Sequence, residues 1–426
     1  MVISRRSLLL AGAAIPTAAY GQCVTDRFAV DACRGGVRIT VPGPSFDQSF
    51  LTGQLGAGAV FTRASTGTYY NSAGTLVSAA INTPRFDYDP ATLQLKGLLL
   101  EDASTNLMLN SGNLAAAGWT GFSAVVAAPV VTANQVNAPD GTLTAARIVI
   151  PAVSAGQTSI WFQAYTATAT IYTHSIWMRG SVGGEQIYLM AQGGTYYSAS
   201  RITLTTQWQR YTLTTPTLTA ATWYLVIGCD TRDGAQSSSG ASGGTIYAWG
   251  AQVEAKDFPT SYIATTSVSV TRAIDSLTYP AASMTWFTPP GGSWFAEFDY
   301  FDPTPTGGRI VGRIGGGPGA LQTPSFPLNS AGQFDGTNPM NTVNTTSPNT
   351  ISKAVSTWAV GQAKVALNGG PVASAANLTT GYPTYATTGI GIMTVLTGAQ
   401  CCDGHIRRIS YWPRVLSDSE MQAVTT

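Results

Sequence analysis

The chain has 426 residues and a formal net charge of +1. This charge is too small to create the positive electrostatic field that attracts nucleic acid or an acidic membrane surface. Only 10% of its residues are charged, against about 25% in a typical globular domain. Its length exceeds one ordinary core and predicts two or three domains. The composition has many β-branched and aromatic residues, frequent Gly and Pro and few helix formers, which predicts an all-β protein. The low net charge predicts that nucleic acid is not a partner.

The first residues have the pattern of an export signal. Arg5 and Arg6 form a twin arginine, an apolar stretch follows over 8–19, and small residues offer a cleavage point near 19–21. The apolar run is too short for an ordinary membrane span. We expect residues 1–22 to be either a twin-arginine-like signal or a hydrophobic N-terminal tail.

The cysteines indicate a disulfide more than a metal site. Cys23 and Cys33 are spaced to close a short loop if the protein reaches an oxidising compartment. No CxxC spacing exists and the chain has only two histidines, so a zinc site is not expected. Cys229 is in phase with the apolar residues of its predicted strand and should be buried.

Residues 23–108 are predicted to form a small N-terminal β module. A hairpin is expected here, with a strand over 60–70 and a turn over 71–74, and a short strand over 96–102. Four carboxylates fall within sixteen residues of this module, namely Asp87, Asp89, Glu101 and Asp102.

Three roles are open for this acidic stretch. On a strand, Asp87 and Asp89 share a face about 6–7 Å apart. The side chains can pair with Arg85 or cap turns beside the neighbouring prolines. They can also hold Ca²⁺, because hard cations take carboxylate and carbonyl oxygens. A third role is that of acid and base in glycoside hydrolysis, which needs two carboxylates.

Residues 109–276 contain a run of strands separated by turn-rich gaps, with no helical period. In the strand over 171–178, Tyr172, His174 and Ile176 share one face, so His174 is predicted to be a sheet histidine. The Gly240–Gly244 stretch has the letters of a G-x-S-x-G elbow, but it lies in a Ser/Gly-rich loop rather than between strand and helix. The pattern predicts a jelly roll or a two-sheet sandwich.

Residues 277–426 are predicted to form a second β unit. The strand near 293–301 alternates apolar and acidic side chains, and Asn368-Gly369 is a strong hairpin-turn pair. After a late strand, Ser417 and Glu420 have the spacing of a capping box, which predicts a short C-terminal helix.

Several of these segments carry a family resemblance. "FTRASTGTYYNSAGTLVSAAINTPRFDYDPATLQLKGLLLEDASTN" and "YAWGAQVEAKDFPTSYIATTSVSVTRAID" resemble segments of tailed-phage and prophage fibre or spike proteins. The strands between them resemble a carbohydrate-binding-module jelly roll. "STWAVGQAKVALNGG" with "GHIRRISYWPRVLSDSEMQAVT" resembles the closing half of a concanavalin A-like, laminin-G-like domain. The resemblance implies tandem β-sandwiches, a jelly roll followed by a concanavalin A-like sandwich.

Glycan sites on such sandwiches place flat aromatic faces against the apolar side of a sugar ring. Aromatic residues in phase on alternating strands are instead predicted to be buried, namely Trp177, Trp223, Trp249, Trp294 and Trp358. Adjacent Tyr196 and Tyr197, in a glycine-flanked segment, are the strongest candidates for an exposed contact. The full set of candidate platforms is Trp119, Trp161, Tyr165, Tyr196, Tyr197, Trp286 and Trp412.

Together these features favour binding over catalysis, with no cofactor apart from the candidate Ca²⁺. We expect a non-catalytic phage-like virion appendage, a head or tail fibre or spike, that attaches to bacterial surface polysaccharide. Its partners would be other virion proteins and further copies of itself, in a homo-oligomer such as a trimer. The alternatives are an exported bacterial protein that degrades or binds polysaccharide, in the periplasm or outside the cell, and a purely structural virion protein.

Overall fold

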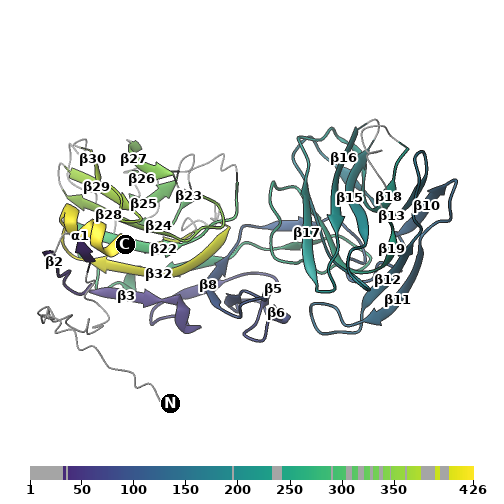
Figure 1. The fold of residues 1–426 in the computed structure, drawn as a ribbon. Helices are drawn as coiled ribbons and strands as arrows, with labels where there is room; N and C mark the ends of the chain where they lie inside the picture. The colour runs from purple at the N-terminus through teal and green to yellow at the C-terminus, as the bar shows by residue number, and fades with distance from the viewer. Residues whose placement is uncertain are drawn as a thin grey trace, which may run out of the picture.

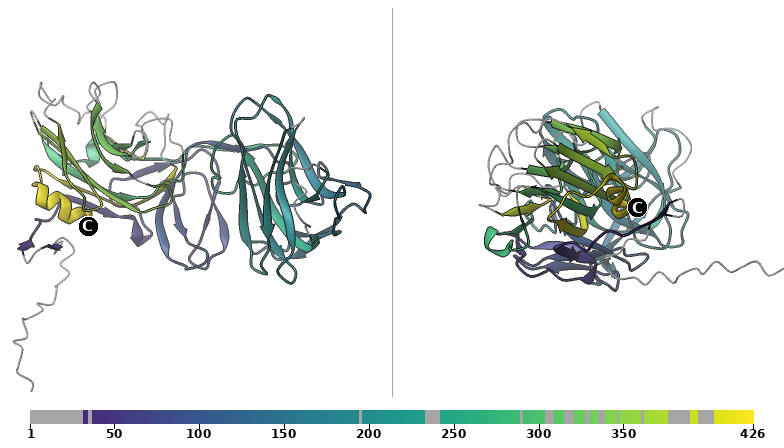
Figure 2. Two further views of the ribbon diagram at one scale, coloured as in Figure 1. Left: turned by 45° about the horizontal axis from the view of Figure 1, so that its top comes forward. Right: turned by 90° about the vertical axis from the view of Figure 1, so that its left-hand side faces the viewer.

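The computed structural model describes residues 32–34, 37–193, 196–232, 242–288, 291–303, 309–314, 321–326, 330–334, 339–345, 347–359, 362–375, 389–393 and 403–426. Over these residues the protein is almost entirely β, which confirms the predicted fold class. Two β-sandwiches lie at opposite ends of the molecule, with a small hairpin between them (Figure 1). Figure 2 shows the same arrangement from two further sides. None of the helices in these ranges is long and apolar enough to cross a membrane.

The jelly roll consists of two five-stranded antiparallel sheets packed face to face. The first sheet has the order β10 (Thr120–Ala124), β13 (Thr158–Ala167), β18 (Ala221–Asp230), β15 (Gln186–Gly193) and β16 (Tyr196–Thr203). The second has the order β11 (Val130–Val136), β12 (Ala145–Ile150), β19 (Gly244–Glu254), β14 (Thr173–Gly180) and β17 (Gln209–Thr214).

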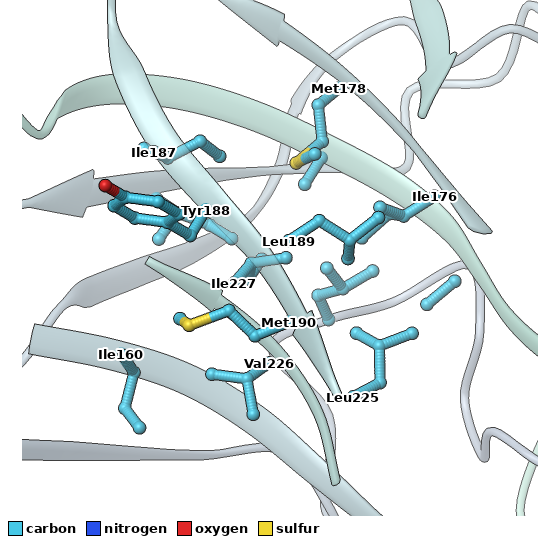
Figure 3. Close-up of a cluster of buried hydrophobic side chains, with 14 of the residues drawn as sticks. Ile160, Ile176, Met178, Ile187, Tyr188, Leu189, Met190, Leu225, Val226 and Ile227 are labelled. Carbon is cyan, nitrogen blue, oxygen red and sulfur yellow. The ribbon is translucent and has the colours of Figure 1, made fainter. Parts of the chain in front are cut away.

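The core of the jelly roll follows from the alternation that the sequence shows. Ile176 and Met178 of β14 lie against Leu189 of β15 and Ile227 of β18, and all four are fully buried (Figure 3). Burying each such side chain stabilises the fold by about 1.5–3 kcal/mol. Trp177, the neighbour of Ile176, points to the opposite face and is also buried, as the alternation predicts.

The other unit, here called the outer sandwich, consists of two eight-stranded sheets. One sheet contains β27 (Pro339–Thr345), β26 (Ser330–Phe334), β25 (Leu321–Phe326), β24 (Gly312–Ile314), β31 (Ile390–Ile392), β21 (Ser276–Tyr279) and β4 (Val60–Thr62), with β23 (Arg309–Ile310) paired to β25. The other contains β30 (Ala373–Ala375), β29 (Gln362–Leu367), β28 (Ser352–Ala359), β22 (Gly292–Phe298), β32 (Gly404–Trp412), β8 (Leu95–Leu100) and β7 (Arg85–Tyr88), with β3 (Phe46–Ser49) paired to β32.

The N-terminal segment does not form the separate module predicted for residues 23–108. Its strands β3, β4, β7 and β8 belong to the two sheets of the outer sandwich. Within this segment, β1 (Ala32–Arg34) with β2 (Val37–Ile39) and β5 (Gly67–Tyr70) with β6 (Leu76–Ala79) form two-stranded sheets of their own, whereas β7 and β8 pair inside a sheet of the outer sandwich. The reason is that Leu98 and Leu100 of β8 are fully buried in the core of the outer sandwich, so this strand needs the opposite sheet to cover it.

The jelly roll is an insertion in the outer sandwich. The chain leaves through β9 (Ser104–Asn106) and returns through β20 (Val270–Arg272), and these two strands pair, with Asn106 opposite Val270. The hydroxyls of Thr105 and Thr271 are 2.8 Å apart across this pair. Residues on either side of the jelly roll therefore build one unit, although more than 160 residues separate them.

The predicted hairpin forms, but its first strand is shorter than expected. The 60–70 segment splits into β4 and β5, and β5 pairs with β6 through Tyr70 and Leu76. The break lies at Arg63, whose guanidinium turns inward and donates to the carbonyl of Ser65 at 2.8 Å. The inward Arg63 side chain thus interrupts the strand between β4 and β5. The alternation of apolar and polar residues did not predict this break.

The C-terminal helix is confirmed, including its cap. In α1 (Asp418–Thr425), the Ser417 hydroxyl accepts from the Glu420 amide at 3.3 Å, and Glu420 Oε2 accepts from the Ser417 amide at 2.7 Å. Leu416 and Met421 are fully buried beside it. Two short 3₁₀ helices, Phe50–Thr52 and Ala281–Ser283, complete the described elements.

Candidate functional site

Three of the predicted aromatic platforms are core residues. Trp119, Tyr165 and Trp412 are only 6%, 5% and 6% exposed, so their ring faces are not open to a ligand. Each satisfies its polar atom inside the protein: the two indoles donate to backbone carbonyls and the Tyr165 hydroxyl lies 2.8 Å from His174 Nε2. The prediction of exposed platforms is wrong for these three residues. Their rings sit near strand ends, where a sequence pattern does not distinguish an inner from an outer face.

Two other predicted platforms are half-buried. Trp161 packs against the jelly-roll core and donates from its indole nitrogen to the Leu114 carbonyl at 2.9 Å. Trp286 stacks on Phe46 with ring centroids 4.0 Å apart. By contrast, all five tryptophans predicted as core are buried: Trp177, Trp223, Trp249, Trp294 and Trp358.

Tyr196 and Tyr197 open β16, but their side chains lie outside the described residues, as do residues 1–31 with Cys23 and residues 233–241 of the Ser/Gly-rich loop. The Cys33 side chain is outside them too. The backbone register is defined and places Tyr197 opposite Gln192 of β15.

The predicted calcium pair is split between two local structures. Asp87 is 6% exposed and accepts from the Tyr70 amide at 2.8 Å, with His405 Nε2 at 3.1 Å. Burial alone would raise the pKa of Asp87, but the hydrogen bond and charge of His405 outweigh it and lower that pKa. Asp89 instead caps a turn through the amides of Thr92 and Ala91. Within the described ranges no group of three His, Cys, Asp or Glu side chains could hold a metal, so Ca²⁺ at Asp87 and Asp89 gains no support.

Glu101 belongs to a buried ion cluster, here called the junction network: Arg63, Arg85, Glu101, Arg272 and Asp275. Glu101 is 0% exposed, its Oε2 lies 2.7 Å from Arg85, and it accepts from the Ser261 hydroxyl at 2.6 Å. Burial opposes ionisation, but the neighbouring Arg272 and Arg85 charges lower the pKa of Glu101 well below its usual range. A buried carboxylate held by two guanidiniums and a hydroxyl has the environment of a structural ion-pair partner.

A pocket of about 270 Å³ lies instead on the outward face of the first jelly-roll sheet. It takes residues from β10, β13, β15 and β18, so four strands of one rigid sheet build it. Its lining, here called the sheet-face pocket, is Phe122, Ile160, Phe162, Gln192, Gly193, Tyr224 and Arg232.

The aromatic rings of the sheet-face pocket are fixed by their neighbours. Phe162 and Tyr224 meet edge to face with centroids 5.4 Å apart. Phe122 is 42% exposed, and the Arg232 guanidinium lies 4.8 Å above its ring. The same guanidinium forms a two-pronged pair with Asp230, at 3.0 and 2.7 Å, which sets its orientation.

Polar atoms accompany these rings. Gln192 lies directly opposite Tyr224 in the sheet, and no described residue hydrogen-bonds its side-chain amide. Three rings, one amide and one oriented guanidinium therefore face the same hollow. Such a set can hold the apolar face of a sugar ring and hydrogen-bond its hydroxyls.

The sequence analysis did not predict the residues of the sheet-face pocket, although it named a neighbouring residue. Trp161 was among the candidates, whereas the adjacent Phe162 lines the pocket, because consecutive strand residues point to opposite faces. The exposed Phe122 in "TGFSA" was the available signal, since a large apolar side chain on a polar strand is unusual.

No protein-family model and no curated protein matches the chain. Similar solved structures include the enzymatically active domain of bacteriophage CBA120 tailspike protein 4, at 14% identity and TM-score 0.26, over 35% of this chain and 21% of that one. A Trypanosoma rangeli sialidase mutant with trans-sialidase activity matches at 18% and 0.29, over 36% and 27%. TmCBM61 in complex with β-1,4-galactotriose matches at 13% and 0.25, over 35% and 97%. The chain thus spans about a quarter of the length of the tailspike domain and the sialidase.

Proposed function

We propose that the protein is a non-catalytic appendage, a head or tail fibre or spike of a phage-like particle, that binds bacterial surface polysaccharide through the sheet-face pocket. The observation that carries the proposal is the convergence of Phe122, Phe162 and Tyr224 with Gln192 and Arg232 on one sheet face. Rings accept the C–H face of a sugar, and the amide and guanidinium select its hydroxyls.

The pocket is shallow and of modest volume, which suits one or two sugar units of a long chain. A single site of this kind binds weakly, but several copies on one particle gain avidity on a repetitive surface. The expected homo-oligomer, such as a trimer, would supply that multiplicity. The placement in a virion, beside other virion proteins, is supported by the resemblance of residues 61–111 and 247–275 to segments of tailed-phage and prophage fibre or spike proteins.

Replacing Tyr224 by alanine is expected to weaken glycan binding at least tenfold, about 1.4 kcal/mol. The variant removes one wall of the pocket and leaves Phe162 without its edge-to-face partner. The full chain is first applied to an array of bacterial capsular and O-antigen polysaccharides, and a short oligosaccharide of a bound polymer is then titrated calorimetrically.

The matched control is Val182→Ala, since Val182 is an 80% exposed apolar residue of the same domain outside the pocket. It should bind like the unmodified chain. Equal affinity of the Tyr224→Ala variant and the unmodified chain, or no polysaccharide bound by either, would overturn the proposal.

A further inference from the structure

A second and larger hollow lies where the jelly roll meets the β5–β6 hairpin. It encloses about 470 Å³, within the range of small-molecule sites. Thr68 and Ser78 line it from the hairpin, Asn110 and Trp249 from the jelly roll, and Thr271 from the returning strand β20. We call it the junction cleft. It shares no residue with the sheet-face pocket.

One wall of the junction cleft presents an unpartnered hydrogen-bond donor. Trp249 is 4% exposed and its ring is held by Tyr262 and Trp177, with centroids 4.6 and 5.6 Å away. No described residue accepts from its indole nitrogen. Buried indoles usually donate, and other tryptophans of the chain do so: Trp119, Trp161, Trp177, Trp208, Trp223 and Trp412.

The space beside this nitrogen is kept open by a glycine. Gly112 lines the cleft, and a Cβ at that position would lie 3.2 Å from Trp249 Nε1. A side chain there would crowd the N–H group. The donor is therefore both without a protein partner and accessible from the cleft, where a ligand oxygen can accept from it.

The charges around the cleft select the kind of ligand. Its charged lining residues are Asp140 and Arg272. Arg272 is 1% exposed and lies within the junction network, 3.5 Å from Glu101 and 3.9 Å from Asp275, so its guanidinium is held by two carboxylates. Asp140 Oδ1 accepts from the Thr142 amide, and its carboxylate is the remaining negative charge at the rim. The rest of the polar lining consists of hydroxyls and amides, which suits a neutral ligand and repels an anionic one.

We propose that the junction cleft is a second saccharide site that takes one or two units of a neutral sugar, with a ring or hydroxyl oxygen accepting from Trp249 Nε1. The proposal rests on the proposed glycan-binding function and adds a separate site with its own selectivity. Two sites on one chain would engage the same polymer with a gain in avidity.

The test uses the full chain labelled with ¹⁵N at tryptophan, so that each indole N–H gives its own NMR signal. Neutral probes are maltotriose, cellotriose and β-1,4-galactotriose, and acidic probes are sialyllactose and trigalacturonate. The Trp249 signal is identified by its absence in Trp249→Phe, which keeps a ring but removes the donor. We expect at least one neutral probe to move this signal while the acidic probes do not.

Affinity supplies the second readout. Loss of one hydrogen bond predicts that Trp249→Phe weakens binding of the neutral probe about three- to tenfold. Trp208→Phe is the matched control, because that indole already donates to the Asn137 carbonyl and Trp208 lies outside the cleft lining. It should leave the affinity unchanged.

The outcomes separate this proposal from the previous one. If no neutral probe moves the Trp249 signal, or acidic probes move it equally, the junction cleft is not a neutral-saccharide site, whatever the Tyr224→Ala variant shows. If the Trp249 signal moves but Tyr224→Ala has no effect on polysaccharide binding, the cleft stands and the sheet-face pocket does not.

Discussion

Replacing Asp275 by asparagine is expected to destabilise the outer sandwich by about 3–5 kcal/mol. Asp275 is fully buried, pairs with Arg63 at 3.1 Å and with Arg85, and accepts from the Glu101 amide at 2.9 Å. Asparagine keeps the shape but removes the negative charge. Three guanidiniums, those of Arg63, Arg85 and Arg272, would then remain in the interior with the Glu101 carboxylate alone, and an unmatched buried charge is costly.

Urea unfolding followed by tryptophan fluorescence measures this loss. The matched control is Asp418→Asn at the exposed pair with Lys364, where the Asp418 side chain is 59% exposed. A surface pair of this kind contributes about 0–1 kcal/mol. If Asp275→Asn costs no more than Asp418→Asn, the junction network does not hold the junction together.

The second large effect concerns the chain's two histidines, one in each sandwich, which are expected to give opposite pH responses. His174, in the jelly roll, is buried without a charged partner, and burial lowers its pKa from 6.5 to about 4. Between pH 6.5 and about 4, His174 is therefore protonated in the unfolded chain but neutral in the folded domain. Jelly-roll stability is fully present above pH 6.5 and falls towards pH 4 by about 3 kcal/mol.

His405, in the outer sandwich, is shifted the other way. Burial alone would lower its pKa, but Asp299 at 2.9 Å and the hydrogen bond to Asp87 outweigh burial and raise it above 6.5. Its stabilisation is present below pH 6.5 and is lost as the pH rises through the higher folded value. The same contacts lower the pKa of both aspartates, so their contribution is lost only in acid, below about 3.8.

Differential scanning calorimetry of the full chain at pH 5 and pH 8 tests this pair of shifts. Acidification should lower the transition of the jelly roll and raise that of the outer sandwich. His174→Phe should remove the first response, and His405→Gln the second. Transitions that move together with pH, or that ignore both substitutions, would contradict the assignment of the two environments.

Local patterns predicted much of this fold, because they depend on neighbours in sequence. The capping box at Ser417 and Glu420 and the alternating core positions of the jelly roll are of this kind. The insertion of the jelly roll was not predictable in the same way. It depends on pairing Asn106 with Val270, and no local signal links strands so far apart.

The prediction of the candidate site was wrong about which residues lie on the outward face of a strand. Choosing Phe162 rather than Trp161 requires knowing which face of β13 is outward, and this depends on how the sheets pack. The close approach of β18 to β13 at Gly228, whose φ is +138°, is likewise set by tertiary structure. A Cβ there would lie 2.4 Å from the Ser159 carbonyl oxygen, so only glycine permits this approach. Such a distortion leaves no periodic trace in the sequence.

Glu101 of the acidic stretch has a structural role in the junction network. The segments over 61–111 and 247–275 contain all five members of the junction network: Arg63, Arg85, Glu101, Arg272 and Asp275. Both segments meet at the point where the jelly roll leaves and re-enters the outer sandwich. Charged residues are rare in this chain, and these are placed where a buried network fixes the junction.

The most direct test of the central claim is hydrogen–deuterium exchange of the full chain with and without a bound bacterial polysaccharide. The account predicts that protection concentrates in the strand segments around Phe122, Phe162, Gln192 and Tyr224, which frame the sheet-face pocket. The α1 region of the outer sandwich should exchange equally in both states. Protection confined to the outer sandwich, with these strands unchanged, would contradict the claim that the jelly roll carries the glycan site.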